Sequence, residues 1–388
     1  MTTTEPRTGT APEPVRGRGR RPRGRPPKYT ADAQDMSLLN TGAKRTSIGI
    51  LLVLAALAPF LFQDDLLRLL AIGCVYAIGA IGLNLVTGYA GQVSLGHAFF
   101  IGVGAYTASV VAGDPTDEDV YGFGITFLPV WLLAAGLVAA LLGLIVSPLA
   151  SRLRGLYLAI VTLGLVFIGE HIYREWDSLT GGVGVGRQGP EPVLFGVDIS
   201  RTTQSFSGDQ QMFWLMLVLL VIFAVVGRNI ARSAMGRSFQ AVRDRDIAAE
   251  ITGVDVRRVK RRAFVVSSFY AGCAGALLYS ILGYIDPASF GLLLSVQFIA
   301  MVLIGGAATI SGSIMGAFFI ALLPRLTQEL PSYLPFLSSS ATQTPNVFQV
   351  EQLLYGLLII LFLIFEPRGL FGVWVRIRNY WKTWPFSY

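Results

Sequence analysis

The chain has 388 residues, of which 53% are hydrophobic and only 14% are charged, and it contains 43 glycines. An average soluble domain is about 25% charged, so this composition excludes an ordinary soluble globular protein. The net charge of +7 does not indicate a nucleic-acid-binding protein, because nearly all of it lies in the first 46 residues.

Residues 1–46 contain ten basic and four acidic residues, are rich in Pro, Gly and Arg, and lack apolar periodicity. Such a segment cannot bury enough apolar surface to fold, so we predict a disordered, basic cytoplasmic arm. An arm of this kind helps to set the topology and can contact anionic membrane lipid. We expect no nucleic acid partner.

Long apolar blocks follow, each near the ~20-residue length of a membrane-spanning helix. They predict an all-α polytopic integral membrane protein whose transmembrane domain covers residues 47–366. We expect about ten transmembrane helices, at residues 47–63, 66–87, 98–112, 125–149, 155–169, 212–227, 263–283, 293–308, 314–326 and 352–366.

The charges fix the expected topology. With both termini cytoplasmic, 26 of the 31 Lys and Arg residues lie inside and 15 of the 24 acidic residues lie outside. This asymmetry is the one that the positive-inside rule requires. It places residues 367–388 in a cytoplasmic C-terminal tail and residues 228–262 in the longest cytoplasmic loop.

The first polar segment, residues 82–100, interrupts an apolar run with glycines and polar groups. Irregular backbone at membrane depth belongs against protein or along a water-filled path. The segment indicates either a broken helix that lines a translocation route or glycines that only permit close helix packing. The residues expected to line the path are Gly88, Tyr89, Gln92, Ser94 and His97.

The second polar segment, residues 304–320, has the same character. At an offset of 219 residues, Ser94 aligns with Ser313 and the run AFFI at 98–101 aligns with AFFI at 317–320. Either an internal duplication or chance similarity between glycine-rich segments explains the match. We expect the second wall of the path here, at Gly305, Gly306, Ser311 and Ser313.

The third segment is the cytoplasmic loop at 228–262. Two small residues on a short helix permit a close approach by another protein, and a following glycine ends the helix. The loop therefore indicates a docking site for a soluble partner, although a solvated basic loop is the alternative. The residues expected to contribute to docking are Arg243, Asp246, Ala248, Ala249, Gly253 and Lys260.

These segments resemble a known family. The loop is similar to the ATPase-docking "EAA" loop of ABC importer permeases, except that Ile247 replaces its Glu and Asp246 lies one position earlier. The sequences TGYAGQVSLGHAFF (87–100), RGLYLAIVTLG (154–164) and EPRGLFG (366–372) resemble the permeases of branched-chain amino acid ABC importers, in particular the LivM-like half of the permease pair. The resemblance covers about residues 47–372.

The resemblance implies an ABC importer permease fold with broken membrane helices, in the plasma (bacterial inner) membrane. It also implies a LivH-like second permease subunit, two cytoplasmic ABC ATPase subunits and an extracytoplasmic amino-acid-binding protein. The chain has no GxxxxGK[ST] loop, so ATP and Mg are expected on the ATPase subunits and no cofactor on this chain. The external stretch 170–211 either contacts the binding protein or is a plain connector.

The implied function is ATP-driven import of leucine, isoleucine and valine by alternating access. Similar permeases carry urea, short amides or other amino acids, and an ATP-independent secondary transporter is a further alternative. The few polar residues argue against a membrane-embedded enzyme and leave no expected catalytic residues. With two cysteines and two histidines in the chain, we expect no metal site.

Overall fold

The computed structural model describes residues 42–117, 120–153, 155–182, 184, 186–194, 196–203, 206–328, 347–366 and 368–383. The chain divides into two units, Met1–Ser47 and Ile48–Tyr388, and the second unit contains nearly all of the described helices and strands. The predicted basic arm lies outside the described residues up to residue 41, as do Arg154 and residues 384–388 of the predicted tail.

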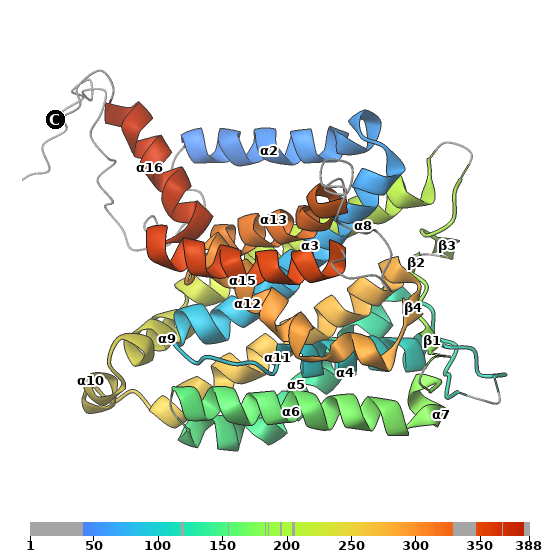
Figure 1. Cartoon of the computed structure of the whole chain (residues 1–388), viewed down its shortest axis with the longest axis horizontal. Coiled ribbons are helices and arrows are strands. Elements are labelled where there is room, and N and C mark those ends of the chain that lie inside the picture. Colours follow the sequence, from blue (N-terminus) through green and yellow to red (C-terminus); the bar gives the residue numbers. More distant parts are fainter. Residues whose placement is uncertain are drawn as a thin grey trace, which may run out of the picture. The chain divides into compact units, whose positions relative to one another are not determined.

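Helices make up most of the described chain (Figure 1). The long helices are α2 (Gly42–Leu61), α3 (Asp64–Asn84), α4 (His97–Ala112), α5 (Leu128–Arg152), α6 (Leu156–Glu175), α8 (Gly208–Arg232), α11 (Val256–Leu282), α12 (Leu292–Gly305), α13 (Ile310–Gln328) and α15 (Val347–Phe365). The shorter elements are a π-helix (Leu85–Tyr89), α7 (Asp177–Thr180), α9 (Ala234–Asp244), α10 (Asp246–Ile251), a 3-10 helix (Pro287–Phe290) and α16 (Gly369–Thr383).

Each of the ten expected spans overlaps one of these long helices, several of which extend beyond the expected bounds. Six helical segments of the described chain are long and apolar enough to cross a membrane: Asp64–Tyr89, Leu128–Arg152, Leu156–Glu175, Gly208–Arg232, Val256–Leu282 and Ile310–Thr327. The apolar stretches of α2, α4, α12 and α15 are shorter than a typical span. The polytopic helical fold is therefore confirmed, while the count of ten crossings and the cytoplasmic termini stay predictions.

Helix α11 lies at the centre of the packing, against α5, α4 and α3. Small residues allow this close approach: a Cβ added at Gly275 would collide with the Ile101 carbonyl, and one added at Gly104 would collide with Gly272. In lipid, where the hydrophobic effect does not bring helices together, such close backbone packing holds helices to one another.

The outer helices present their apolar side chains outward. Large exposed apolar residues lie along α5 at Leu133, Leu137, Leu141 and Ile145, and along α8 at Val218 and Ile222. A water-soluble monomer rarely exposes apolar patches of this extent, whereas lipid-facing helices require them.

Figure 1 shows α9 and α10 at one end of this unit, and α7 with β1 and β4 at the other end. At the second end, β1 (Arg187–Gln188) pairs antiparallel with β4 (Tyr284–Ile285), and β2 (Val193–Leu194) pairs with β3 (Val197–Asp198). The buried Arg187 side chain donates hydrogen bonds to the carbonyls of Ser109 (2.8 Å), Leu179 (3.0 Å) and Tyr121. This guanidinium therefore joins the last turn of α4, helix α7 and the loop at Tyr121, which are distant in the sequence.

Candidate functional site

The predicted break in the first polar segment is present. Helix α3 passes into the π-helix, whose wider turn ends with the bond from Ala90 N to Leu85 O. Helical structure then stops until His97, and Gln92 N bonds back to Val86 O at 2.9 Å. Single π-helical turns occur frequently at functional sites, so this turn indicates a functional role for the segment.

The non-helical stretch 90–96 finds its hydrogen-bond partners inside the protein. Leu95 N donates to Thr162 Oγ1 of α6 at 2.9 Å. At the start of α4, Ala98 N donates to Ser295 Oγ of α12 at 3.0 Å. Side chains of neighbouring helices thus satisfy backbone groups that no water reaches in a bilayer, which is how an irregular segment persists at membrane depth.

The two predicted walls lie side by side, joined by a residue that the sequence analysis did not single out. The buried Asn84 side chain accepts from Ala308 N at 2.8 Å and donates to Ser313 Oγ at 2.7 Å and to Thr309 O at 3.0 Å. A second bond links Tyr89 to the backbone of Ile310. A lone Asn within an otherwise apolar helix was the available signal, since buried amides need partners.

The remaining predicted path residues differ in their surroundings. Ser313 is fully buried, whereas Ser311 is exposed. Gly305 and Gly306 are buried where α12 meets its neighbours: a Cβ at Gly305 would collide with the Gly312 carbonyl, and one at Gly306 would lie 2.6 Å from Arg368 O. These two glycines therefore serve close packing in this conformation.

Two polar side chains of the first segment, Gln92 and His97, contain buried atoms that have no hydrogen-bond partner. Gln92 and His97 are 4% and 2% exposed, respectively. Both amide atoms of Gln92 and the Nε2 atom of His97 are buried and form no hydrogen bond within the described chain. His97 is bonded to the Gly79 backbone and lies beside the Phe298 ring, with centroids 5.0 Å apart. Each unsatisfied buried group costs about 1–3 kcal/mol. A solute or a second subunit that forms hydrogen bonds with these atoms would therefore remove this cost.

The cytoplasmic loop folds into α9 and α10, and Gly253 ends α10 as the sequence predicts. Gly253 has φ +87°, its N–H donates to Glu250 O, and Val254 N–H donates to Ala249 O. These two bonds form a Schellman motif, which favours glycine at the left-handed position. Nothing lies within 4 Å of a Cβ added at Gly253, so conformation and not space selects the glycine here.

The small pair on α10 divides between two faces. Ala249 is buried against the protein, whereas Ala248 is exposed. The exposed face also carries Ile247 and Ile251, which are 65% and 82% exposed. We call Ile247, Ala248 and Ile251 the α10 face. The apolar character of this face was not predicted, because in the sequence Ile247 stands out only as a departure from the family pattern.

The charged residues of the loop make contacts within the chain. Lys260, whose side chain is 8% exposed, forms an ion pair with Asp246 at 3.6 Å. Arg243 bonds to the Gly88 carbonyl at 3.0 Å. Asp255 caps α11, and hydrogen bonding from the Arg258 backbone, reinforced by nearby arginines, holds the pKa of its carboxyl below the usual value.

The C-terminal motif packs against the second wall. Gly369 has φ +62°, and a Cβ there would lie 2.5 Å from Ile304 O and 2.7 Å from Gly306 N. In the same motif, Glu366 accepts two hydrogen bonds from Arg376 of α16. Residues 368 and 369 therefore pack against the end of α12, which gives the motif a structural role that its sequence did not disclose.

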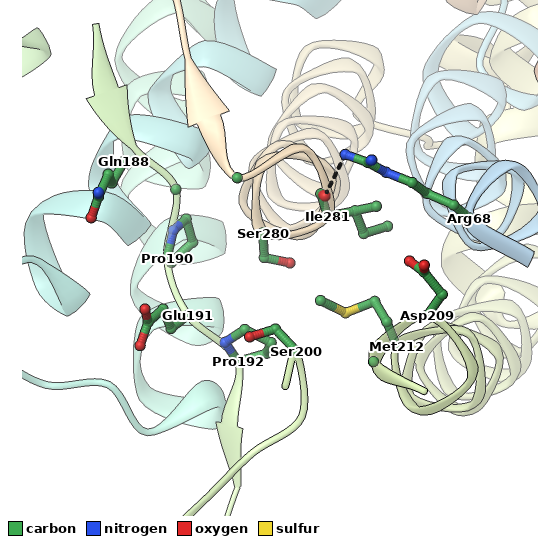
Figure 2. Close-up of a pocket in the computed structure, with 13 residues that line it drawn as sticks. Arg68, Gln188, Pro190, Glu191, Pro192, Ser200, Asp209, Met212, Ser280 and Ile281 are labelled. Atoms are coloured by element: carbon green, nitrogen blue, oxygen red, sulfur yellow. Dashed lines mark hydrogen bonds between the residues drawn. The ribbon is translucent and has the colours of Figure 1, made fainter. Parts of the chain in front are cut away.

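A pocket of about 420 Å³ opens at the other end of the unit, among β1, α8 and the end of α11. Figure 2 shows Arg68 and Asp209 on one side of it and Glu191 across from them. The Arg68 guanidinium bonds to Ile281 O at 3.3 Å. None of the predicted path residues lines this pocket.

Among the described residues, no group of three or more His, Cys, Asp or Glu could hold a metal, and Cys74 and Cys273 are buried free thiols.

Comparison with known proteins assigns the family. A family model described as "Branched-chain amino acid transport system / permease component" matches residues 66–363. The permease LivM of the high-affinity branched-chain amino acid transport system of Escherichia coli (strain K12) is 32% identical over 361 residues, which cover 89% of this chain and 78% of LivM. The permease LivH of the same type of system in Salmonella typhimurium is 25% identical, over 80% of this chain and 96% of LivH.

A shorter match, 35% identical over 127 residues, joins 31% of this chain to 36% of the autoinducer 2 import permease LsrC of Klebsiella pneumoniae. No solved structure matches the chain. The expected location in the plasma membrane, as a multi-pass protein, is confirmed by the permease relatives and the six candidate spans. The chain belongs to the family of permease components of branched-chain amino acid transport systems.

Proposed function

We propose that the chain is the LivM-like permease subunit of an ATP-driven importer for leucine, isoleucine and valine. It pairs with a LivH-like permease subunit, two cytoplasmic ABC ATPase subunits and an extracytoplasmic amino-acid-binding protein. Relatives of both permease types match most of the chain, which supports a system with two such subunits. ATP and Mg bind to the ATPase subunits, and this chain carries no cofactor and catalyses no reaction.

The observation that carries the ATP-driven part of the proposal is the α10 face. Ile247 and Ile251 expose apolar side chains on a short helix outside the candidate spans. Exposed apolar side chains gathered on one face mark protein–protein interaction sites. A soluble ATPase that covers this face removes these side chains from water, at about 25 cal/mol per Å² of apolar surface.

The path is proposed to run between the two polar segments. Gly88, Tyr89, Gln92, Ser94 and His97 form one wall, and Gly305, Gly306, Ser311 and Ser313 form the other. The unpartnered buried atoms of Gln92 and His97 support this placement, because a polar solute supplies the missing hydrogen bonds as it passes. Binding along the path is weak, since a solute held tightly would be slow to leave.

Transport by the reconstituted importer tests the proposal. The chain, its permease partner and the ATPases are placed in proteoliposomes, and uptake of radiolabelled leucine is measured with the binding protein present. We expect uptake that requires ATP and is inhibited by isoleucine and valine. Uptake of urea in place of leucine would favour the alternative solutes, and leucine uptake without ATP would favour a secondary transporter.

A further inference from the structure

The last turn of α9 lies directly on the broken membrane segment. Arg243 Nη1 donates a hydrogen bond to the Gly88 carbonyl oxygen at 3.0 Å. A Cβ added at Gly91 would lie 2.8 Å from Arg243 Cγ and 3.2 Å from its Cα. The cytoplasmic helix and the membrane segment are thus in contact at Gly88 and Gly91, with no room for a side chain between them at Gly91.

The break in the helix explains why the Gly88 carbonyl is available. In a regular α-helix this carbonyl would accept from the N–H of residue 92. Here Gln92 N bonds to Val86 O instead, because the π-helix shifts the register. The Arg243 guanidinium replaces the missing donor, and its charge makes the bond stronger than one between neutral groups.

The guanidinium is held in place on its other side. Its Nε and Nη2 atoms both donate to Asp244 Oδ1, at 3.1 and 3.0 Å. This ion pair lies at the surface, since the side chains of Arg243 and Asp244 are 37% and 68% exposed, and it leaves Nη1 directed at Gly88. A displacement of the last turn of α9 must therefore either carry Gly88 with it or break the hydrogen bond.

Gly88 is also in contact with the second polar segment. A Cβ at Gly88 would collide with Asn84 Oδ1 and lie 2.5 Å from Ala308 N. Asn84 in turn is bonded to Ala308, Thr309 and Ser313. Ala308 has φ +59°, a left-handed conformation that costs a non-glycine residue free energy and persists only where its surroundings enforce it.

We propose that Arg243 is a positioning residue that transmits movement of α9 and α10 to the π-helix and, through Asn84, to the turn before α13. This inference rests on the proposed function, because the ATPase subunits are the source of that movement. The sequence indicated Arg243 as part of a rim for a partner. The structure assigns it an internal role instead, as the link between the docking helices and both walls of the path.

The test compares Arg243→Gln with Arg245→Gln in the complete importer. Arg245 is exposed two residues further on and has no side-chain partner in the described chain, so it is the matched control. We expect Arg243→Gln to lower leucine uptake at least about tenfold, the factor that a lost charge-assisted bond corresponds to. ATP hydrolysis by the same complexes stays near the wild-type rate, so the number of ATP molecules spent per leucine rises. Arg245→Gln changes neither rate.

Hydrogen exchange supplies a readout that a merely structural role would not change. In the wild-type complex, a non-hydrolysable ATP analogue is expected to alter exchange of backbone amides both in residues 234–251 and in residues 85–97. In Arg243→Gln the first change remains and the second is lost. Gly91→Ala is a second variant that keeps the charge but forces α9 away from the segment, and we expect the same uncoupling.

The outcomes separate this inference from the proposed function. Wild-type complexes that show no ATP-dependent leucine uptake overturn the proposed function. The exchange pattern is then the only test of whether Arg243 links α9 and α10 to residues 85–97. Normal uptake by Arg243→Gln, or a nucleotide response of residues 85–97 that survives in this variant, overturns the linkage and leaves the importer in place.

Discussion

Asn84 illustrates how one buried amide joins two membrane segments. Asn84→Leu keeps the approximate volume but leaves Ala308 N, Thr309 O and the Ser313 hydroxyl without this partner. We expect the free energy of unfolding to fall by about 3 kcal/mol, because buried groups without partners cost about 1–3 kcal/mol each. Thermal unfolding of the purified protein in detergent measures the loss. Ser311→Ala, at an exposed site, is the control, and equal stability of the two variants would show that the Asn84 bonds contribute nothing.

Arg187 provides a second residue-scale case, at the opposite end of the unit from α10. Burial lowers the pKa of its guanidinium, yet the group is held by three carbonyls. Arg187→Met retains much of the side chain's length and removes every donor. We expect a loss of roughly 3 kcal/mol in the free energy of unfolding, since three carbonyls lose a charged partner and that of Ser109 lies in a buried site.

Limited proteolysis localises the effect of this change. Cleavage is expected to become faster in the segments that Arg187 joins, at the loop around Tyr121 and at α7 around Leu179, while cleavage around α9 and α10 stays the same. Arg201→Met is the control, because that side chain is 78% exposed and its ion pair with Asp198 lies at the surface. A variant at Arg187 that is no more sensitive than this control would contradict a structural role for the buried guanidinium.

At the scale of elements, the α10 face gives a test of docking. Ile251→Asp places a charge where an apolar side chain is 82% exposed, so the isolated chain should fold unchanged while contact with a partner is lost. We expect the yield of ATPase subunits that copurify to fall about tenfold, since burying one Ile is worth about 1.5–3 kcal/mol. Glu250→Gln, on the same helix, is the control.

Substitutions of Ala249 or Gly253 are less suitable than Ile251→Asp for this docking test, because they also affect the fold of the chain. Ala249 is buried inside the chain, so a bulky residue there would disturb the fold and not only docking. Gly253 has open space but a positive φ, so a substitution strains the end of α10 by roughly 1–2 kcal/mol. Copurification of ATPases with Ile251→Asp at the wild-type level would show that the α10 face is not the docking site.

The elements show which features the sequence could predict. Apolar length located the ten helices, and the glycines at Gly88 and Gly91 indicated the break, because helix geometry and backbone strain are local. The partners of these residues could not be predicted, since Arg243 is far from Gly88 in the sequence and only packing brings them together. For the same reason the buried side of α10 was unknown. Ala248 and Ala249 are adjacent and chemically identical, and the placement of the helix decides which one faces outward.

At the scale of the whole molecule, the number of membrane crossings depends on the short helices. Helix α12 has 14 residues, fewer than the ~20 that a perpendicular span needs. Burial allows α12 to be this short. It packs against α13, α15 and α3, and a helix surrounded by protein need not match the thickness of lipid.

Cysteine labelling of intact cells tests the crossings of α12 and α15. In a variant with Cys74 and Cys273 replaced by Ala, we expect Arg245→Cys and Arg378→Cys to be shielded from an impermeant reagent and Glu191→Cys to be modified. One candidate span, α8, separates Glu191 from Arg245, so these two positions must lie on opposite sides. In the described chain, four of the expected membrane helices, α11, α12, α13 and α15, separate Arg245 from Arg378, and an even number of crossings returns the chain to the same side. If either α12 or α15 alone failed to cross, Arg378→Cys would be modified from outside. That result would contradict both the ten crossings and the cytoplasmic C-terminus. It would also place basic residues of the C-terminal tail outside, against the positive-inside rule.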